Sequence, residues 1–253
     1  MQTAILTDPD ASREAGAMAA LGAGNPLLAD WTSPFGLPPF DRIDAGHFEP
    51  AFEAAFREHD DQIAAIARNP AAPDFDNTVL ALEEAGALLA RIDPVFQALC
   101  ASLTSEPLQA VERAISPRLA VHRSAVYLDG PLFTRLDRLH RQMAELGLDA
   151  EQQRVLERLH REFVQAGARL DEPQKRRCSQ IIERLAGLAT TFSQNVLADE
   201  AAFQLVLRDE AELAGLPEFA RATARQAARD RGIEDAWVIT LARSSVEPFL
   251  TFS

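Results

Sequence analysis

Apolar side chains recur every three or four positions along most of the chain, which is the spacing of one face of an α-helix. The first such run stops near Asn69-Pro70, because a proline disfavours helical geometry in the residue before it. Its members, which we expect on one buried face, are Phe48, Phe52, Phe56, His59, Ile63 and Ile66. The pattern therefore predicts a helix that begins at about residue 48.

The second run extends to Leu103, and either Asp76 or Asn77 is expected to cap its helix. Its apolar stripe is Val79, Leu82, Leu89, Ile92, Phe96, Leu99 and Leu103. We expect Asp93-Pro94 to kink or break this helix, since proline lacks the amide donor that a helix interior needs.

Three further helices are predicted between residues 105 and 166. Ser105 and Pro107 are typical of a cap and a first turn, and the short helix that follows should break before Pro117. Asp129-Gly130-Pro131 opens the next helix, which should end at Gly147. Asp149 with Gln152 has the spacing of a capping box. The apolar stripes comprise Leu108, Val111 and Ile115; Leu132, Leu136, Leu139, Met143 and Leu146; and Val155, Leu159, Phe163 and Ala166.

Asp171 and Pro173 start the longest late helix, and after it the apolar period changes. Its stripe is Cys178, Ile181, Leu185, Leu188, Phe192 and Val196. Residues 203–207 and 237–241 are short β-type runs that can pair, and between them lies a helix from Pro217 to Arg231 that Gly232 ends. The predicted fold class is mainly α, with many helices and a small β element near the C-terminus.

The two ends of the chain do not follow a helical period. Residues 1–24 are predicted to form a loose tail, and residues 25–39 an extended arm anchored by Leu27, Leu28, Trp31 and Phe35. The last residues leave Phe249, Leu250 and Phe252 uncovered, so we expect that the sequence is cut inside a larger protein. The alternative is a natural terminus docked into the core.

Composition narrows the class of protein. The 253 residues are 47% hydrophobic and 25% charged, which is typical of a soluble globular chain. Lys plus Arg is 25 and Asp plus Glu is 38, so the net charge is 25 − 38 = −13, which disfavours nucleic acid as a partner. We interpret the basic run Lys175-Arg176-Arg177 as a solvated helix face.

The cysteines and the hydropathy predict a cytoplasmic protein. Cys100 and Cys178 lack zinc-ligand or redox spacing, and we interpret both as buried reduced thiols, which fits a reducing compartment. The first residues do not resemble a signal peptide, and the sequence has no run of about 18 uncharged apolar residues, so no membrane partner is expected.

The sequence contains no residue pattern of a known type of active site. None of the five histidines belongs to an HExxH pattern, and we interpret them as ordinary surface or half-buried side chains: His47, His59, His122, His140 and His160. There is no GxSxG, no cysteine with a histidine partner and no phosphate-binding loop. The adjacent carboxylates Asp60-Asp61 and Glu83-Glu84 are interpreted as solvated. The prediction is no catalytic, cofactor-binding or metal-ligating residue.

A series of short motifs nevertheless occurs in a characteristic order. It comprises NPLL at 25–28, PPFDRI at 38–43, HFEPAF at 47–52, FDNTVLALEEAG at 75–86, LLARIDPVF at 88–96, LFTRL at 132–136, FVQAGARL at 163–170, FSQNVLADE at 192–200, LAGLP at 213–217 and the final WVITLARSSVEPFLTFS. In this order the chain resembles the N-terminal part of the thimet-oligopeptidase-like zinc peptidases. The bacterial peptidyl-dipeptidase branch is the nearest, with oligopeptidase A as a near relative.

The resemblance implies a fold and a context. In that family two largely helical lobes flank a channel that admits short peptides, and the zinc and its HExxH helix lie in a later part that this chain lacks. Residues 25–253 would then form a channel wall of a peptidase that releases C-terminal dipeptides. By this resemblance the chain ends before the catalytic zinc domain, binds no zinc, is inactive alone and has the catalytic half as its partner.

Two other hypotheses remain open. The chain is alternatively a stand-alone helical module that binds peptides or another protein, or a fragment of an oligopeptidase A-like endopeptidase.

Overall fold

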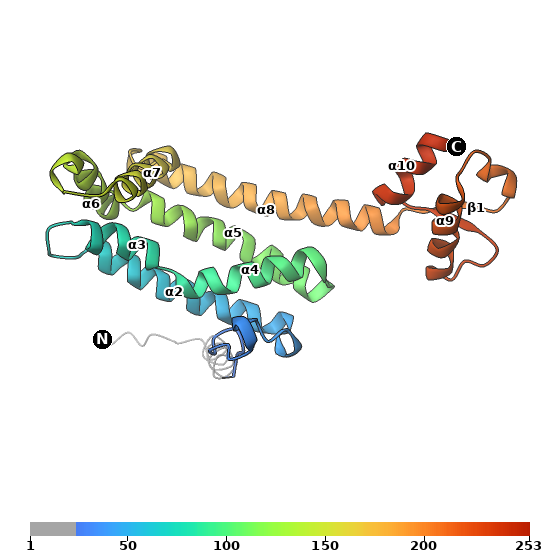
Figure 1. Cartoon of the computed structure of the whole chain (residues 1–253), viewed down its shortest axis with the longest axis horizontal. Helices are drawn as coiled ribbons and strands as arrows, with labels where there is room; N and C mark the ends of the chain where they lie inside the picture. The colour runs from blue at the N-terminus through green and yellow to red at the C-terminus, as the bar shows by residue number, and fades with distance from the viewer. Residues whose placement is uncertain (1–23) are drawn as a thin grey trace, which may run out of the picture. The chain divides into compact units, whose positions relative to one another are not determined.

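The computed structural model describes residues 24–253, so the predicted tail at residues 1–24 lies almost entirely outside the described part. The chain divides into two compact units after Leu188. The predicted fold class is confirmed: the described chain is mainly helical, with one small sheet near its end (Figure 1).

The first unit is built from helices with short connections. They are α2 (Phe48–Ala67), a π-helix (Phe75–Leu80), α3 (Ala81–Glu84), α4 (Ala87–Ser102), α5 (Glu106–Leu128), α6 (Gly130–Arg141), α7 (Ala150–Ala166) and the start of α8 (Glu172–Ala202). Helix α2 packs against α4, α5 and α6 (Figure 1). The capping box predicted from Asp149 and Gln152 is present at the start of α7.

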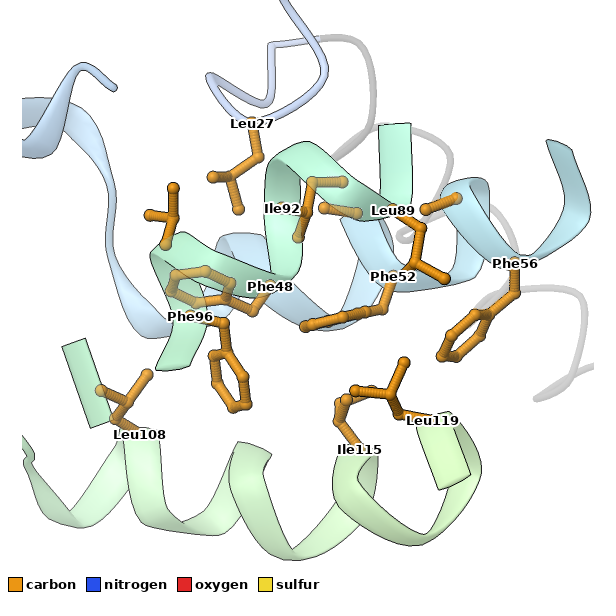
Figure 2. Packing of buried hydrophobic residues seen from close by; sticks show 13 residues of the cluster. Leu27, Phe48, Phe52, Phe56, Leu89, Ile92, Phe96, Leu108, Ile115 and Leu119 are labelled. Carbon is orange, nitrogen blue, oxygen red and sulfur yellow. The ribbon is translucent and has the colours of Figure 1, made fainter. Parts of the chain in front are cut away.

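An aromatic cluster joins α2, α4 and α5. The rings of Phe48 and Phe52 lie 4.9 and 5.4 Å from that of Phe96, measured between centroids. Ile92 and Ile115 close the cluster from α4 and α5 (Figure 2). Burial of each such side chain stabilises the fold by roughly 1.5–3 kcal/mol, so this cluster fixes the three helices together.

The segment before α2 contributes one deeply buried residue to the same cluster. Leu27 is fully buried, and Leu28 and Trp31 pack against the same cluster, as predicted. The prediction for Phe35 is wrong, because its side chain is 99% exposed in a tight turn where its φ is +61°.

A second cluster lies where α6 and α7 meet α2 and the π-helix. Leu132, Leu136 and Leu156 are fully buried in it, and Phe163 is almost fully buried. Arg135 lies beside it, also buried, and holds the connection that follows α2. Its guanidinium donates to the carbonyls of Asn69 and Ala71, and to the side chains of Asn77 and Thr78.

The break predicted before Pro117 is wrong, and at Pro94, where a kink or a break was predicted, the helix is not broken. Helix α4 continues through Pro94 and α5 continues through Pro117. A proline in a helix interior costs about 3 kcal/mol, but buried residues flank each one, such as Val95 beside Pro94 and Ile115 beside Pro117. Their burial keeps both helices intact.

Other boundaries differ from the prediction. The break in the second run falls at Gly86, whose φ is +76°. The cap of the π-helix is Asp74, whose side chain accepts from the amide of Asn77, so neither Asp76 nor Asn77 is the cap. Helix α6 ends at Arg141, before a short 3-10 helix, so it stops earlier than the predicted Gly147.

The second unit contains the predicted sheet. Strands β1 (Leu205–Leu207) and β2 (Trp237–Ile239) pair antiparallel, and α9 (Glu218–Asp230) connects them, as predicted. Helix α10 (Arg243–Phe252) follows. The core of this unit comprises Leu207, Leu213, Leu216, Ala220, Ala224 and Ile239. Phe249 packs against that core, so the expectation that it is uncovered is wrong, whereas Leu250 is 76% exposed, as predicted.

Three predictions about burial on helices are also corrected. The apolar stripe of α8 is present in sequence but exposed, with Leu185 at 60% and Phe192 at 70%. Lys175 is buried and pairs with Glu172, so the basic run is not wholly a solvated face. Cys100 and Cys178 are free thiols, but each is half-buried, not fully buried.

Candidate functional site

A groove with an apolar floor and a charged rim lies within the first unit. Its volume is about 380 Å³. The floor is formed by Leu82, Val126, Tyr127, Leu159 and Phe163, and the rim by His59, Glu83, Arg123, Arg158 and Glu162. Helices α2, α3, α5 and α7 supply these residues, so packing of the helices creates the groove.

The rim carries charges of both signs. The Arg158 guanidinium on α7 lies 3.2 Å from the carboxylate of Glu83 on α3 and 3.8 Å from that of Glu162. These side chains are about half exposed, so the pairs contribute little to stability. A groove with apolar floor and a rim of both signs offers hydrogen bonds and charge to a peptide-like ligand.

One histidine of the rim is bonded to a histidine on another helix. His59 Nδ1 on α2 lies 2.9 Å from His122 Nε2 on α5, in hydrogen-bond contact. His122 Nδ1 lies 3.4 Å from the Asp60 carboxylate. Burial lowers the pKa of both imidazoles, and each is therefore favoured in its neutral form near pH 7.

A second histidine pair joins α6 to α7. The rings of His140 and His160 stack with centroids 3.8 Å apart. His160 Nε2 contacts Asp137 Oδ1 at 2.9 Å, and Asp137 also pairs with Arg141 and Arg169. Burial alone would raise the pKa of Asp137, but its bond to His160 and the nearby arginines outweigh burial, and the pKa is lowered.

From the sequence the histidines were interpreted as ordinary surface or half-buried side chains, and the structure brings four of them together in two pairs. The partners lie 63 and 20 positions apart, which no local spacing rule relates. One signal was available, since His59 lies on the predicted apolar face of its helix. His47 instead accepts from the amide of Asp44 at the start of α2. The carboxylates Asp60 and Glu83, expected to be solvated only, each face a basic partner.

The described residues include no grouped metal ligands, and the Cys100 thiol is held protonated. Among residues 24–253, no three side chains of His, Cys, Asp or Glu are grouped to hold a metal. Burial, assisted by Glu112, raises the pKa of Cys100 to about 12, which keeps that thiol protonated and unreactive. Within the same residues, no helix combines the length and apolar character needed to cross a membrane.

Comparison with known proteins gives clear relatives. No protein-family profile matches the chain. It is 40% identical over 226 residues to dipeptidyl carboxypeptidase of Escherichia coli, a match that covers 89% of this chain and 33% of that protein. The chain is therefore related to the dipeptidyl carboxypeptidases and oligopeptidases A. This confirms the resemblance found in the motifs.

The oligopeptidases A are more distant relatives. Oligopeptidase A of Escherichia coli is 29% identical over 229 residues, and the organellar enzyme of Arabidopsis thaliana is 26% identical over 234 residues. These matches cover 90% of this chain, and 33% and 29% of the respective relatives. The chain thus spans about a third of the length of the relatives it matches.

Proposed function

We propose that this chain is the helical, non-catalytic portion of a zinc peptidase that releases dipeptides from the free C-termini of short peptides. The observation that carries the proposal is the match to dipeptidyl carboxypeptidase, which extends over 89% of the chain at 40% identity. The lower identity to oligopeptidase A, 29%, favours the exopeptidase branch over an endopeptidase.

The residues present do not fit a catalytic zinc. The sequence has no HExxH, and four of its five histidines are engaged with each other in the described structure. A zinc peptidase needs three protein ligands and an open position for water. In this proposal the ligands and the general base belong to a catalytic part outside this chain, and the isolated chain is inactive.

The groove supports a role in forming a wall of the peptide channel. Its apolar floor suits aliphatic side chains of a substrate, and its rim carries both signs of charge for the peptide backbone and termini. The proposed partners are therefore short peptides and the catalytic part. The free thiols of Cys100 and Cys178 support a cytoplasmic location.

A helical interaction module is the second candidate, and one observation favours it. The apolar stripe on α8 is exposed in this chain, as an interaction surface would be.

A chimera tests the proposal. In the chimera, this chain replaces the matching third of the Escherichia coli dipeptidyl carboxypeptidase. Two peptides of the same sequence serve as substrates, one with a free and one with an amidated C-terminus, and the cleavage products of each are identified. The proposal predicts that zinc-loaded chimera releases dipeptides from the free peptide only. Internal cleavage of both peptides would indicate the oligopeptidase branch, and a folded but inactive chimera would favour the interaction module.

A further inference from the structure

The contact between His59 and His122 lies where three segments of the first unit meet. His122 on α5 is buried, and its ring packs against Phe56 of α2 with centroids 4.6 Å apart. The His59 ring faces Gly86, the turn between α3 and α4, where an added Cβ would lie 3.1 Å from the imidazole. The Gly86 amide donates to the side chain of Gln62 on α2. The imidazole pair thus joins α2 to α5 beside a tightly packed turn.

The surroundings assign the protons of the pair. The carboxylate of Asp60 faces His122 Nδ1, so that nitrogen carries the proton. His122 Nε2 is then the acceptor, and His59 donates from Nδ1 across the 2.9 Å contact. Both rings therefore hold their single proton on Nδ1.

We propose that the His59–His122 contact is an acid-sensitive latch, which joins α2 to α5 at neutral pH and opens when both imidazoles are protonated. One added proton can reside on His59 Nε2 and leaves the bond intact, because His122 Nε2 still accepts. The second proton must bind His122 Nε2 itself. Two donors then face each other and two like charges lie side by side, so the contact is lost.

Other charged groups surround the pair from every packed element, and none replaces the latch. On the His59 side the groove carries Glu83 from α3, Arg123 from α5, and Arg158 and Glu162 from α7. On the His122 side lie Glu53, Arg57 and Asp60 from α2, Arg118 from α5 and Glu183 from α8. Arg158 is paired with Glu83 and Arg118 with Glu53, whereas the Asp60 carboxylate lies 3.4 Å from His122 Nδ1.

The direction of the pH effect follows from burial. The pKa of each imidazole is lowered, chiefly by desolvation, so the unfolded chain binds protons that the folded chain resists. The stability from the latch is complete above the ordinary histidine pKa, about 6.5, and is lost as the pH falls below it.

Opening of the latch would alter the candidate groove. His59 lines that groove, whereas His122 lines a separate hollow of about 450 Å³ between α2 and α5. Each ring therefore lines one of the two spaces, and the two rings are in direct contact. Acid would therefore change the shape of the groove, whichever reaction the complete protein catalyses.

A double-mutant cycle tests the latch in the full chain. Unfolding constants are measured by denaturant titration for wild type, His59→Gln, His122→Gln and the double variant, at pH 8 and pH 5. The latch predicts a coupling of about fivefold or more at pH 8 that falls to about twofold or less at pH 5. A matched cycle of His47→Gln with His122→Gln should show no coupling at either pH, since His47 does not contact His122.

A second measurement needs no variant. The ¹⁵N spectra of histidine-labelled wild type should show, at pH 8, two neutral rings with the proton on Nδ1, and both rings charged once the pH is low enough to open the latch. Equal coupling at the two pH values, no coupling at pH 8, or an Nε2 proton on His122 at pH 8 would each overturn the proposal.

Discussion

The imidazoles of His140 and His160 lie face to face, with ring centroids 3.8 Å apart and planes 4° from parallel. Two charged rings at this distance would repel, and burial together with His160 lowers the pKa of His140. The stack therefore belongs to the neutral form of His140. Asp137 holds the pair in place through its contact with His160 Nε2.

Asp137→Asn should weaken the contact between α6 and α7. The amide cannot supply the charge that faces His160 and Arg141, and we expect a loss of about 1–3 kcal/mol in the free energy of unfolding at pH 7. Because the folded pKa of Asp137 is lowered, this stability exists above the unfolded pKa and disappears as the pH falls through the folded value.

Denaturant titrations at several pH values check this result. The difference between wild type and variant should narrow below about pH 4. Glu157→Gln is the control, since Glu157 forms an exposed pair with Arg154. This substitution should change the free energy of unfolding by less than about 1 kcal/mol. A difference for Asp137→Asn that stays constant from pH 7 to pH 3 would contradict the assignment.

Arg135→Ala should destabilise the connection after α2. The buried guanidinium satisfies two carbonyls and two side chains, and their loss leaves buried acceptors without donors. We expect the free energy of unfolding to fall by about 2–4 kcal/mol, measured by chemical denaturation. Arg138→Ala on the same helix is the control, because Arg138 is exposed. Equal effects of the two variants would show that the bonds of Arg135 do not stabilise the fold.

Asp74→Ala should remove the cap of the π-helix. Asp74 accepts from the amide of Asn77, and the Asn77 side chain accepts from the amide of Asp74. Loss of such a cap costs about 1 kcal/mol, visible as a lower melting temperature. Asp76→Ala, two residues along, should change stability by less than about 0.5 kcal/mol. A larger loss of stability for Asp76→Ala than for Asp74→Ala would instead identify Asp76, one of the two residues expected from the sequence, as the cap.

Phe249→Ala and Leu250→Ser should differ in their effect on stability, because one side chain of α10 is packed and the other is exposed. Phe249 contacts the core of the second unit, so its truncation should cost about 1–3 kcal/mol, less than for a fully buried phenylalanine. Leu250 is 76% exposed, and its substitution should leave the melting curve of the second unit unchanged. If both variants melt like wild type, Phe249 does not stabilise this core.

The helical period predicts most of the fold because each face is encoded within a few residues. The stripe from Phe48 to Ile66 specifies α2 on its own, and the change of period before Leu205 specifies the first strand. Errors arise where distant packing decides the outcome. Pro94 and Pro117 are tolerated because the helices around them pack into cores whose other residues are distant in the sequence. Helix α8 shows that an apolar stripe does not itself reveal whether another element covers it.

The site was less predictable than the fold. His122 and His160 look like ordinary helical histidines in sequence, and their partners are supplied by other helices. The rim of the groove likewise combines Glu83 with Arg158, which are 75 positions apart. Such pairings follow from the crossing of helices, which the sequence period does not encode.

We propose that this chain contributes structure, and not chemistry, to a peptidase. The most direct measurement is the release of dipeptides from a peptide with a free C-terminus. It is followed first for the purified chain with zinc, and then after addition of the separately expressed remainder of the Escherichia coli dipeptidyl carboxypeptidase. We expect no release by the chain or the remainder alone, and release that rises with added chain until the two are equimolar. Dipeptide release by the chain alone would contradict this proposal. Release by the remainder that does not depend on added chain would also contradict it.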